Sequence, residues 1–227
     1  MAAKTPSSDR GKTKVFTVDD HRIVRQGIRL LVNQEPGLEV VGEADNVHGA
    51  LTEIDRLHPD IAVVDLSLKG GSGLDLIKDI QIRHPGLAVL VLSTRDESFY
   101  AERVLRAGAR GYITKEEGSE KVIEGIREIL SGKVYLSGKM ASKMLSRMVG
   151  AAKPRELPSV RDLSDRELEV FELVGQGMPT RDIAARLHLS VKTVESHREH
   201  IKEKLGLDSA SDLLRHAIQW VQNQSGP

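Results

Sequence analysis

The segment Ile61-Ala-Val-Val-Asp-Leu66 places an acidic residue directly after an uninterrupted apolar run. A second run of this kind, Ala88-Val-Leu-Val-Leu92, follows later in the chain. Apolar runs without alternating polar residues are typical of strands that are covered on both faces, as in parallel sheets. The pattern therefore predicts that Asp65 lies at the end of a buried parallel strand.

Three further strand-like segments flank these two runs, at Lys14–Val18, Leu38–Val41 and Gly111–Thr114. The segments between them carry apolar residues at helical spacing. We therefore predict an α/β fold, a doubly wound five-stranded parallel sheet with right-handed crossovers. This domain is expected to span residues 13–131, after a disordered tail at 1–12.

The last third of the chain reads as entirely helical and predicts a small all-α domain over residues 160–225. Ser164-Asp-Arg-Glu167 is a capping box that opens the first of four helices. The others are expected at Thr180–Leu187, Val191–Leu205 and about Ser209–Val221. Residues 132–159 are predicted to be a linker, with one weakly amphipathic stretch at Met140–Met148.

The composition excludes several classes of function. The 227 residues include no cysteine, which excludes a disulfide framework, a thiolate nucleophile and a cysteine zinc site. No apolar run is long enough to span a bilayer, and the amino terminus lacks the apolar segment of a signal peptide, so we expect a cytoplasmic protein with no membrane partner. The formal net charge is zero, so the prediction of a DNA partner depends on a motif.

Polar residues gather at the carboxyl ends of the predicted strands, where open parallel sheets bind ligands. Carboxylates about 4 Å apart repel by roughly 1 kcal/mol per pair in water and more at a protein surface, which a divalent cation relieves. Asp65, at the tip of the central strand, is best placed as the nucleophile. A single aspartate after a strand is usually a helix cap, but here the strand ends agree: Asp19-Asp20, Asp65, Ser93-Thr94 and Lys115.

Residues 14–131 resemble the receiver domain of two-component response regulators. The resemblance rests on Val18-Asp-Asp-His21, Val63-Val-Asp-Leu66, Gly73, Leu92-Ser93, Ala107-Gly-Ala109 and Gly111-Tyr-Ile-Thr-Lys115. It implies a flavodoxin-like fold in which Asp65 accepts phosphate from a histidine kinase. It further implies that Mg²⁺ is held by Asp19, Asp20, Asp65 and the Ser67 carbonyl, and that the switch residues are Ser93, Tyr112 and Lys115.

Two positions in this domain leave alternatives open. Tyr112 is equally well explained as a packed aromatic residue whose hydroxyl lies in water. Lys69 stands where the family commonly has proline, and the adjacent Gly70-Gly71 suggests a looser loop beside the phosphorylation site. That departure leaves the rate of autodephosphorylation open.

Two of the predicted helices, Thr180–Leu187 and Val191–Leu205, have the dimensions of a helix-turn-helix, and Ser190 is a natural cap for the second. An ordinary helical bundle is the alternative. Val194, Ile201 and Leu205 are expected to face the domain core, which leaves the opposite face for DNA.

Residues 160–222 resemble the LuxR-type DNA-binding domain of the NarL/FixJ class of regulators. The matching residues are Leu163-Ser-Asp-Arg-Glu167, Val170, Gly177, Asp182-Ile-Ala184, Leu187, Leu189-Ser190, Lys192-Thr-Val194, His197, Ile201 and Lys204-Leu205. The DNA contacts that this predicts are Thr180, Arg181, Lys192, Thr193, Glu195, Ser196, His197, Arg198 and Glu199.

Individual positions in this domain carry their own expectations. His197 is equally well explained as a packing residue. Pro179 replaces a common cap serine, so Thr180 is expected to cap its helix. Glu195 and Glu199 stand where many relatives are basic, which favours an altered base preference over lost DNA binding.

The two resemblances together predict a transcription regulator of a two-component system that phosphorylation switches. A homodimer, formed on phosphorylation, is expected to bind paired half-sites of DNA. The last helix, with Leu213, Leu214, Ile218 and Trp220, either pairs the subunits or closes the domain core.

We do not expect an enzyme, apart from catalysis by the receiver of its own phosphorylation and dephosphorylation. A hydrolase that uses an aspartyl intermediate is one alternative, but it commonly needs a second acid where Ser67 stands. A regulator that acts only through protein contacts is another, and salt-dependent binding to a particular duplex would distinguish it.

Overall fold

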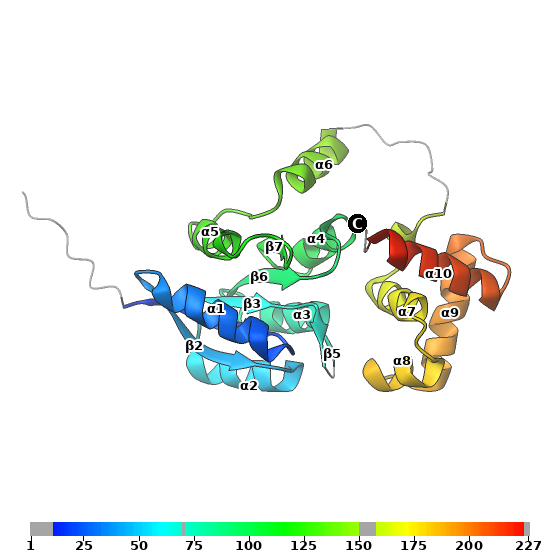
Figure 1. Ribbon diagram of the computed structural model, residues 1–227, viewed down its shortest axis with the longest axis horizontal. Coiled ribbons are helices and arrows are strands. Elements are labelled where there is room, and N and C mark those ends of the chain that lie inside the picture. Colours follow the sequence, from blue (N-terminus) through cyan, green and yellow to red (C-terminus); the bar gives the residue numbers. More distant parts are fainter. Residues whose placement is uncertain (1–10, 70, 150–157, 225–227) are drawn as a thin grey trace, which may run out of the picture.

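The computed structural model describes residues 11–69, 71–149 and 158–224. A parallel sheet of order β2-β1-β3-β6-β7 forms the centre of the N-terminal part (Figure 1). The α/β fold is therefore confirmed, and each strand lies within three residues of its predicted bounds. The strands are β1 (Thr13–Val18), β2 (Leu38–Ala44), β3 (Ile61–Val64), β6 (Ala88–Ser93) and β7 (Gly111–Thr114).

Helices cover both faces of this sheet, because successive strand residues point to opposite sides. On one face, α1 (Arg22–Gln34) and α5 (Ser119–Leu130) pack on a buried cluster that includes Val63 and Leu90. On the other, α2 (Val47–Leu57), α3 (Gly73–Arg83) and α4 (Glu97–Arg106) pack on a cluster that includes Phe16 and Val64. The apolar runs are thus buried on both sides, as predicted.

A short antiparallel pair follows the central strand and corrects one expectation. β4 (Ser67–Leu68) pairs with β5 (Gly71–Ser72), and Lys69 forms an isolated bridge with Asn46. The expected looser loop is wrong at these positions, because backbone pairing holds both sides of the turn. Gly70 lies outside the described residues.

The segment predicted as a linker contains a helix, α6 (Gly138–Val149). Its buried Met140 packs in the cluster that covers the α4 face of the sheet. Just before α6, the Ser137 backbone N–H donates to Glu97 at 2.9 Å, which ties the start of the segment to α4. Residues 150–157 and most of the predicted tail, residues 1–10, lie outside the description.

The C-terminal part consists of the short 3₁₀ helix η1 (Val160–Asp162) and four helices: α7 (Asp165–Gly175), α8 (Thr180–Arg186), α9 (Val191–Leu205) and α10 (Ala210–Gln224). The capping box of α7 is confirmed, since Ser164 accepts from the Glu167 N–H and Glu167 accepts from the Ser164 N–H. Ser190 caps α9 as expected.

The expected cap of α8 is wrong. Pro179 occupies the N-cap position and offers no side-chain acceptor, while Thr180 is the first helical residue. The Thr180 hydroxyl instead accepts a hydrogen bond from Arg198 of α9 at 3.2 Å.

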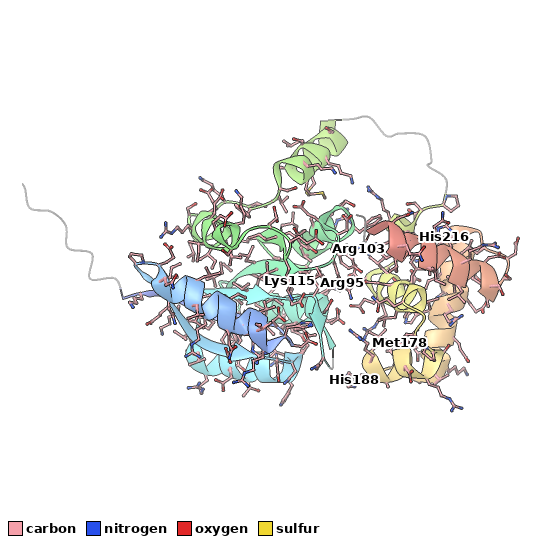
Figure 2. The ribbon with its side chains drawn as sticks, viewed as in Figure 1. Arg95, Arg103, Lys115, Met178, His188 and His216 are labelled. Carbon is pink, nitrogen blue, oxygen red and sulfur yellow. The ribbon has the colours of Figure 1, made fainter. Side chains whose placement is uncertain are left out.

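The two parts of the chain pack against each other through α7 and α10 (Figures 1 and 2). Phe99 of α4 meets Trp220 of α10 edge to face, with ring centroids 5.2 Å apart, and Trp220 in turn packs on Phe171 of α7. Buried Leu213 and Ala217 bind α10 to its own domain. α10 therefore both closes the domain core and contacts the receiver part. No helix in the described ranges is long and apolar enough to cross a membrane.

Candidate phosphorylation site and DNA-binding surface

Backbone hydrogen bonds bring the predicted polar residues to one edge of the sheet. The Asp65 N–H donates to Val18 O at 2.8 Å, the Asp19 N–H to Ala44 O at 3.1 Å, and the Lys115 N–H to Ser93 O at 2.9 Å. Because each of these bonds joins the ends of neighbouring strands, the side chains meet regardless of their distance in the sequence.

Lys115 holds two of the carboxylates. Its Nζ lies 2.6 Å from Asp19 Oδ2 and 2.8 Å from Asp65 Oδ2, and both carboxylates are almost fully buried. Although partial burial lowers the pKa of Lys115, the charges and hydrogen bonds of Asp65 and Asp19 raise it overall. The ammonium therefore stays charged at neutral pH and offsets part of the carboxylate repulsion.

Two buried oxygens of the cluster, Asp20 Oδ1 and Asp65 Oδ1, have no hydrogen-bond partner among the described residues, and only the first has the His21 ring beside it. Asp65 Oδ1 is buried and accepts no hydrogen bond from the described residues. A buried carboxylate oxygen without a donor is costly, and a cation or an incoming phosphoryl group would remove that cost. Asp19, Asp20, His21 and Asp65 each offer a ligand atom, and these atoms lie within 4.8 Å of one another. Three carboxylates suit a hard cation such as Mg²⁺.

His21 belongs to this group although it was not among the predicted site residues. Its Nδ1 lies 2.8 Å from Asp20 Oδ1 and 3.2 Å from Asp19 Oδ1. Its position directly after the acidic pair was the available signal. The side chain is mostly exposed, so His21 lies at the rim of the cluster beside both carboxylates.

A glycine allows the chain to pass behind Asp65. A Cβ added to Gly73 would lie 2.1 Å from the Asp65 carbonyl oxygen and 2.6 Å from the Leu66 Cα. Any side chain there would push back the strand end that carries the carboxylate. Ser67, whose carbonyl is a predicted metal ligand, lies nearby at the start of β4 and is half-buried.

The structure corrects one part of the alternative interpretation of Tyr112, the hydroxyl that was expected to lie in water. Tyr112 is buried, and its hydroxyl donates to the Arg95 backbone oxygen at 2.7 Å rather than lying in water. Burial raises the pKa of Tyr112 well above its ordinary value, although the Arg95 charge acts in the opposite direction. Ser93 is also fully buried. Both side chains contact the Arg95 backbone, since the Arg95 N–H donates to Ser93 Oγ at 3.5 Å.

Arg95 connects this edge to the C-terminal part, and sequence reasoning missed it. Its guanidinium contacts Glu172 Oε2 at 2.7 Å and donates to Ser67 Oγ at 3.2 Å. Tyr100 of α4 donates to the same Glu172 oxygen at 2.7 Å. The only local signal was an arginine two residues after the strand-end Ser93, because its partner lies far away in the sequence.

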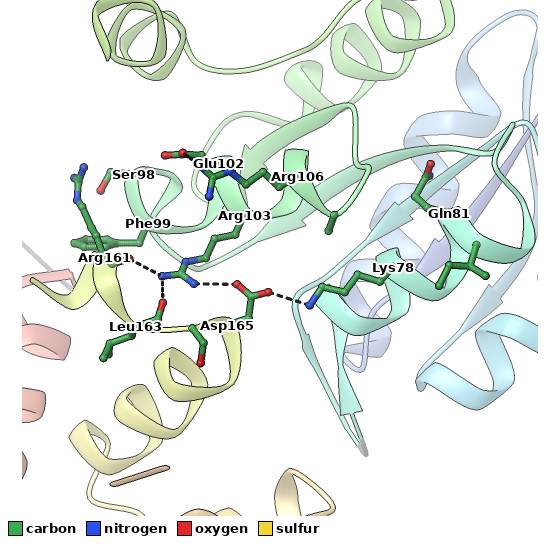
Figure 3. A pocket seen from close by; sticks show the side chains of 13 residues that line it. Lys78, Gln81, Ser98, Phe99, Glu102, Arg103, Arg106, Arg161, Leu163 and Asp165 are labelled. Atoms are coloured by element: carbon green, nitrogen blue, oxygen red, sulfur yellow. Dashed lines mark hydrogen bonds and ion pairs between the residues drawn. The ribbon is translucent and has the colours of Figure 1, made fainter. Parts of the chain in front are cut away.

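A second group of contacts joins the two parts around Asp165. Arg103 contacts Asp165 at 2.9 Å and donates to the Leu163 backbone oxygen at 2.7 Å, while Lys78 contacts Asp165 at 2.9 Å (Figure 3). Burial raises the pKa of Asp165, but hydrogen bonds from Lys78 and Arg103 lower it overall. These contacts line a pocket of about 920 Å³ between α3, α4 and the start of α7.

The predicted DNA-contacting residues lie on α9 and at the start of α8. Arg181, Lys192, Glu195, Ser196 and Glu199 are exposed, and Thr180, Thr193, His197 and Arg198 are half-buried. The core face is as predicted, with Val194, Ile201 and Leu205 buried. The exposed residues remain accessible while the receiver part is docked, so docking does not cover this surface.

Two protein families match the chain. Residues 15–127 match the family described as response regulator receiver domain, and residues 161–217 match bacterial regulatory proteins of the luxR family. The chain is 35% identical over 211 residues to the oxygen regulatory protein NreC of Staphylococcus epidermidis, an alignment that covers 91% of this chain and 97% of NreC. The protein of the same name from Staphylococcus carnosus is also 35% identical, with the same coverage.

Solved structures show the same two-part architecture. The response regulator RcsB of Salmonella typhimurium matches with a TM-score of 0.72 at 26% identity, covering 93% of this chain and 98% of RcsB. RcsB of Salmonella enterica serovar Typhimurium, bound to a promoter in the presence of the phosphomimetic BeF₃⁻, matches with a TM-score of 0.68 at 26% identity, covering 91% of this chain and 98% of that one.

The chain therefore belongs to the two-component response regulators of the NarL/FixJ class, which join a receiver domain to a LuxR-type DNA-binding domain. It is a transcription regulator under the control of phosphorylation.

Proposed function

We propose that Asp65 is the residue that becomes phosphorylated, and that the phosphoryl group controls the C-terminal domain through Tyr112 and Arg95. The observation that carries this proposal is a set of contacts at the Asp65 edge of the sheet that reaches α7 through Arg95. The Lys115 ammonium holds Asp65, Tyr112 donates to the Arg95 backbone, and the Arg95 side chain binds Glu172.

The acidic group at the rim suits magnesium. Asp19, Asp20 and Asp65 would supply carboxylate oxygens, and the Ser67 carbonyl would complete the set. Mg²⁺ held there would neutralise charge on the phosphoryl oxygens. The predominance of oxygen donors and the unpartnered Asp65 Oδ1 support this assignment.

Phosphoryl transfer needs little from the receiver beyond positioning. A carboxylate oxygen of Asp65 forms a bond to phosphorus as the phosphorus–nitrogen bond of a kinase phosphohistidine breaks, and the released imidazole takes up a proton. Lys115 and the Ser93 hydroxyl then contact phosphoryl oxygens. Hydrolysis of the acyl phosphate by water reverses the modification. The receiver would thus assist its own phosphorylation and dephosphorylation without acting on another substrate.

When Lys115 and Ser93 move toward the phosphoryl group, the packing around the Tyr112 side chain changes. The Tyr112 hydroxyl donates to the Arg95 carbonyl, so a shift of the tyrosine displaces the Arg95 backbone. The Arg95 side chain forms the ion pair with Glu172 and would move with it. Because Arg95 and Glu172 are both largely buried, separating them leaves two uncompensated charges, which favours release of the whole contact over partial loosening.

The docked arrangement contains an unfavourable group that release would relieve. The buried Trp220 indole N–H has no acceptor among the described residues. An unsatisfied buried donor costs about 1–3 kcal/mol, a cost that is lost once water reaches the ring. Docking, held by ion pairs and by the packing of Phe99 on Trp220, is therefore opposed by one built-in cost, as suits a reversible switch.

On DNA, we propose that a homodimer places α9 of each subunit in paired half-sites. RcsB–DNA complexes and RcsB dimers on DNA are known among the solved relatives. Because five of the nine expected DNA contacts stay exposed in the docked state, control would act through α10 and subunit pairing rather than by covering α9. We assign residues 13–131 to the receiver, 132–159 to the linker and 160–225 to the DNA-binding domain, with a sensor histidine kinase as partner and the cytoplasm as the place of action.

The direct test is intact mass after incubation with acetyl phosphate and Mg²⁺, in the wild type and in Lys115→Ala. Peptide mapping of the product is expected to place one acid-stable, base-labile phosphoryl group on Asp65. Lys115→Ala should still be modified but should fail to change DNA binding, because the contact that senses the phosphoryl group is gone. A phosphoryl group on another residue would refute the assignment.

A further inference from the structure

A second group of possible metal ligands lies in the DNA-binding domain, far in sequence from the acidic rim. Glu167 of α7 and His197 and His200 of α9 each offer a ligand atom, and these atoms lie within 4.8 Å of one another. Two imidazoles and one carboxylate form a ligand set that Zn²⁺ uses, commonly with water in the fourth position.

The local structure explains why these three side chains meet. His197 and His200 are separated by three positions, so they share one face of α9. His197 is half-buried beside α7 and His200 is exposed at the edge of the contact between the two helices, while the capping box of α7 fixes Glu167 in its first turn. The hydrogen bonds that hold the Glu167 carboxylate, from the Ser164 N–H and from Lys204 Nζ, both fall on Oε2 at 2.7 Å. Oε1 is therefore left as the ligand atom.

We propose that Glu167, His197 and His200 form a binding site for a zinc-class divalent cation that joins α7 to α9 in the DNA-binding domain. The ionisation states agree with this assignment. Burial lowers the pKa of His197, so its ring is neutral near pH 7, as a ligand must be. Burial raises the pKa of Glu167, but bonds from Lys204 and Ser164 lower it overall and keep it a carboxylate.

The donor atoms separate this site from the acidic rim of the receiver. Imidazole ligands suit Zn²⁺, Co²⁺, Ni²⁺ and Cu²⁺, whereas Mg²⁺ prefers oxygen donors. Excess Mg²⁺ is therefore expected to occupy the receiver rim and leave the histidine pair free. A bound cation would cross-link two helices of the folded state and would raise the thermal unfolding temperature of the C-terminal domain.

The test is a Co²⁺ titration of the full chain in excess Mg²⁺, followed by visible absorption and native mass spectrometry. We expect one equivalent of Co²⁺ with the intense bands of a tetrahedral site, displaced by Zn²⁺. His200→Gln and His197→Gln each remove one ligand and should weaken binding by more than the roughly 10–100-fold that loss of an outer-shell partner costs. Glu167→Gln should weaken it too, with unfolding measured in parallel to show that the domain remains folded.

Two variants serve as matched controls for the histidine chemistry. His216→Gln removes an exposed imidazole on α10, and His21→Gln removes the imidazole beside the receiver carboxylates. Both should bind Co²⁺ like the wild type. The proposal is overturned if His200→Gln binds Co²⁺ as tightly as the wild type, if the bands disappear in His21→Gln, or if no equivalent binds in the presence of Mg²⁺.

Discussion

The receiver rim and the surface of α9 place their functional residues in opposite environments. Asp19, Asp65 and Ser93 are buried at strand ends, where backbone bonds to neighbouring strands fix each position. On α9, Lys192 and Glu195 project from one exposed helix face. The rim should therefore respond to single substitutions in an all-or-none manner, whereas the helix surface should respond in small, independent steps.

The largest effect is expected at Asp65. Asp65→Asn removes the nucleophilic carboxylate, so phosphorylation by acetyl phosphate and Mg²⁺ should be abolished, as intact mass measures. Asp79→Asn, on α3, is the matched loss of one carboxylate and should be modified like the wild type. A phosphoryl group that still appears in Asp65→Asn would show that a residue other than Asp65 can be phosphorylated.

Gly73→Ala tests how tightly the chain encloses the rim. The added methyl would lie 2.1 Å from the Asp65 carbonyl oxygen, so the strand end must shift. We expect a loss of about 1–3 kcal/mol or more in the free energy of unfolding, measured with urea, together with slower phosphorylation. Gly27→Ala in α1, where nothing lies within 4 Å, should be neutral or should stabilise by up to roughly 1 kcal/mol. Equal effects of the two substitutions would refute the close packing.

Arg95 and Glu172 test the connection between the two regions. A double-mutant cycle of Arg95→Ala and Glu172→Gln, read by the equilibrium between docked and undocked domains, should give a coupling energy of about 0.5–3 kcal/mol. Small-angle scattering or spin-label distances would measure the docking. Arg106→Ala is the control, because Arg106 lies on α4 and forms an exposed ion pair with Glu102. Its coupling energy with Glu172→Gln should be too small to measure.

Substitutions on α9 should divide into two kinds. Lys192→Ala is expected to weaken binding to all duplexes alike and to reduce the salt slope by about one unit, since we propose that Lys192 contacts one phosphate. Glu195→Ala is expected to change base preference at one position by about 1–3 kcal/mol, because glutamate accepts from cytosine. Fluorescence anisotropy with a selected duplex and its single-base variants would measure both. A total loss of binding in Glu195→Ala would contradict the graded response.

The smallest expected effect is the change of stability with pH that the titration of His197 causes. Burial holds its pKa below 6.5 in the folded protein, so the unfolded chain takes up the proton first as the pH falls. Stability should therefore decline slightly from about pH 6.5 downward to the folded pKa, and not above that window. Imidazole NMR resonances in metal-free buffer would give the value. A pKa above 6.5 would mean that the nearby Glu167 charge outweighs burial.

Much of the receiver could be predicted from the sequence, because the relevant signals are local. The apolar runs at Ile61–Val64 and Ala88–Leu92 identify buried strands, and the topology of parallel sheets brings Asp19, Asp65 and Lys115 together whatever lies between them. The helix caps at Ser164 and Ser190 could likewise be predicted from the sequence, since each depends on a hydrogen bond to a residue three positions away.

The remaining features depend on contacts that no local pattern encodes. Arg95 reaches Glu172 across two domains, and Trp220 packs on Phe99, so neither role is visible in its own segment. The Thr180 cap was wrong because the helix begins one residue earlier than that cap requires, with Pro179 at the N-cap position and Thr180 already helical. Pairing of β4 with β5 replaced the expected loose turn through backbone bonds that glycine content alone does not reveal.

Trp220, the only tryptophan in the chain, offers the most direct measurement of the switch because it lies at the contact between the domains. Its fluorescence can be followed while acetyl phosphate and Mg²⁺ modify the protein. We expect a red shift that keeps pace with the gain of one phosphoryl group, no shift in Asp65→Asn, and a shift already present in unmodified Glu172→Gln. Full phosphorylation of Asp65 with an unchanged Trp220 spectrum would contradict it.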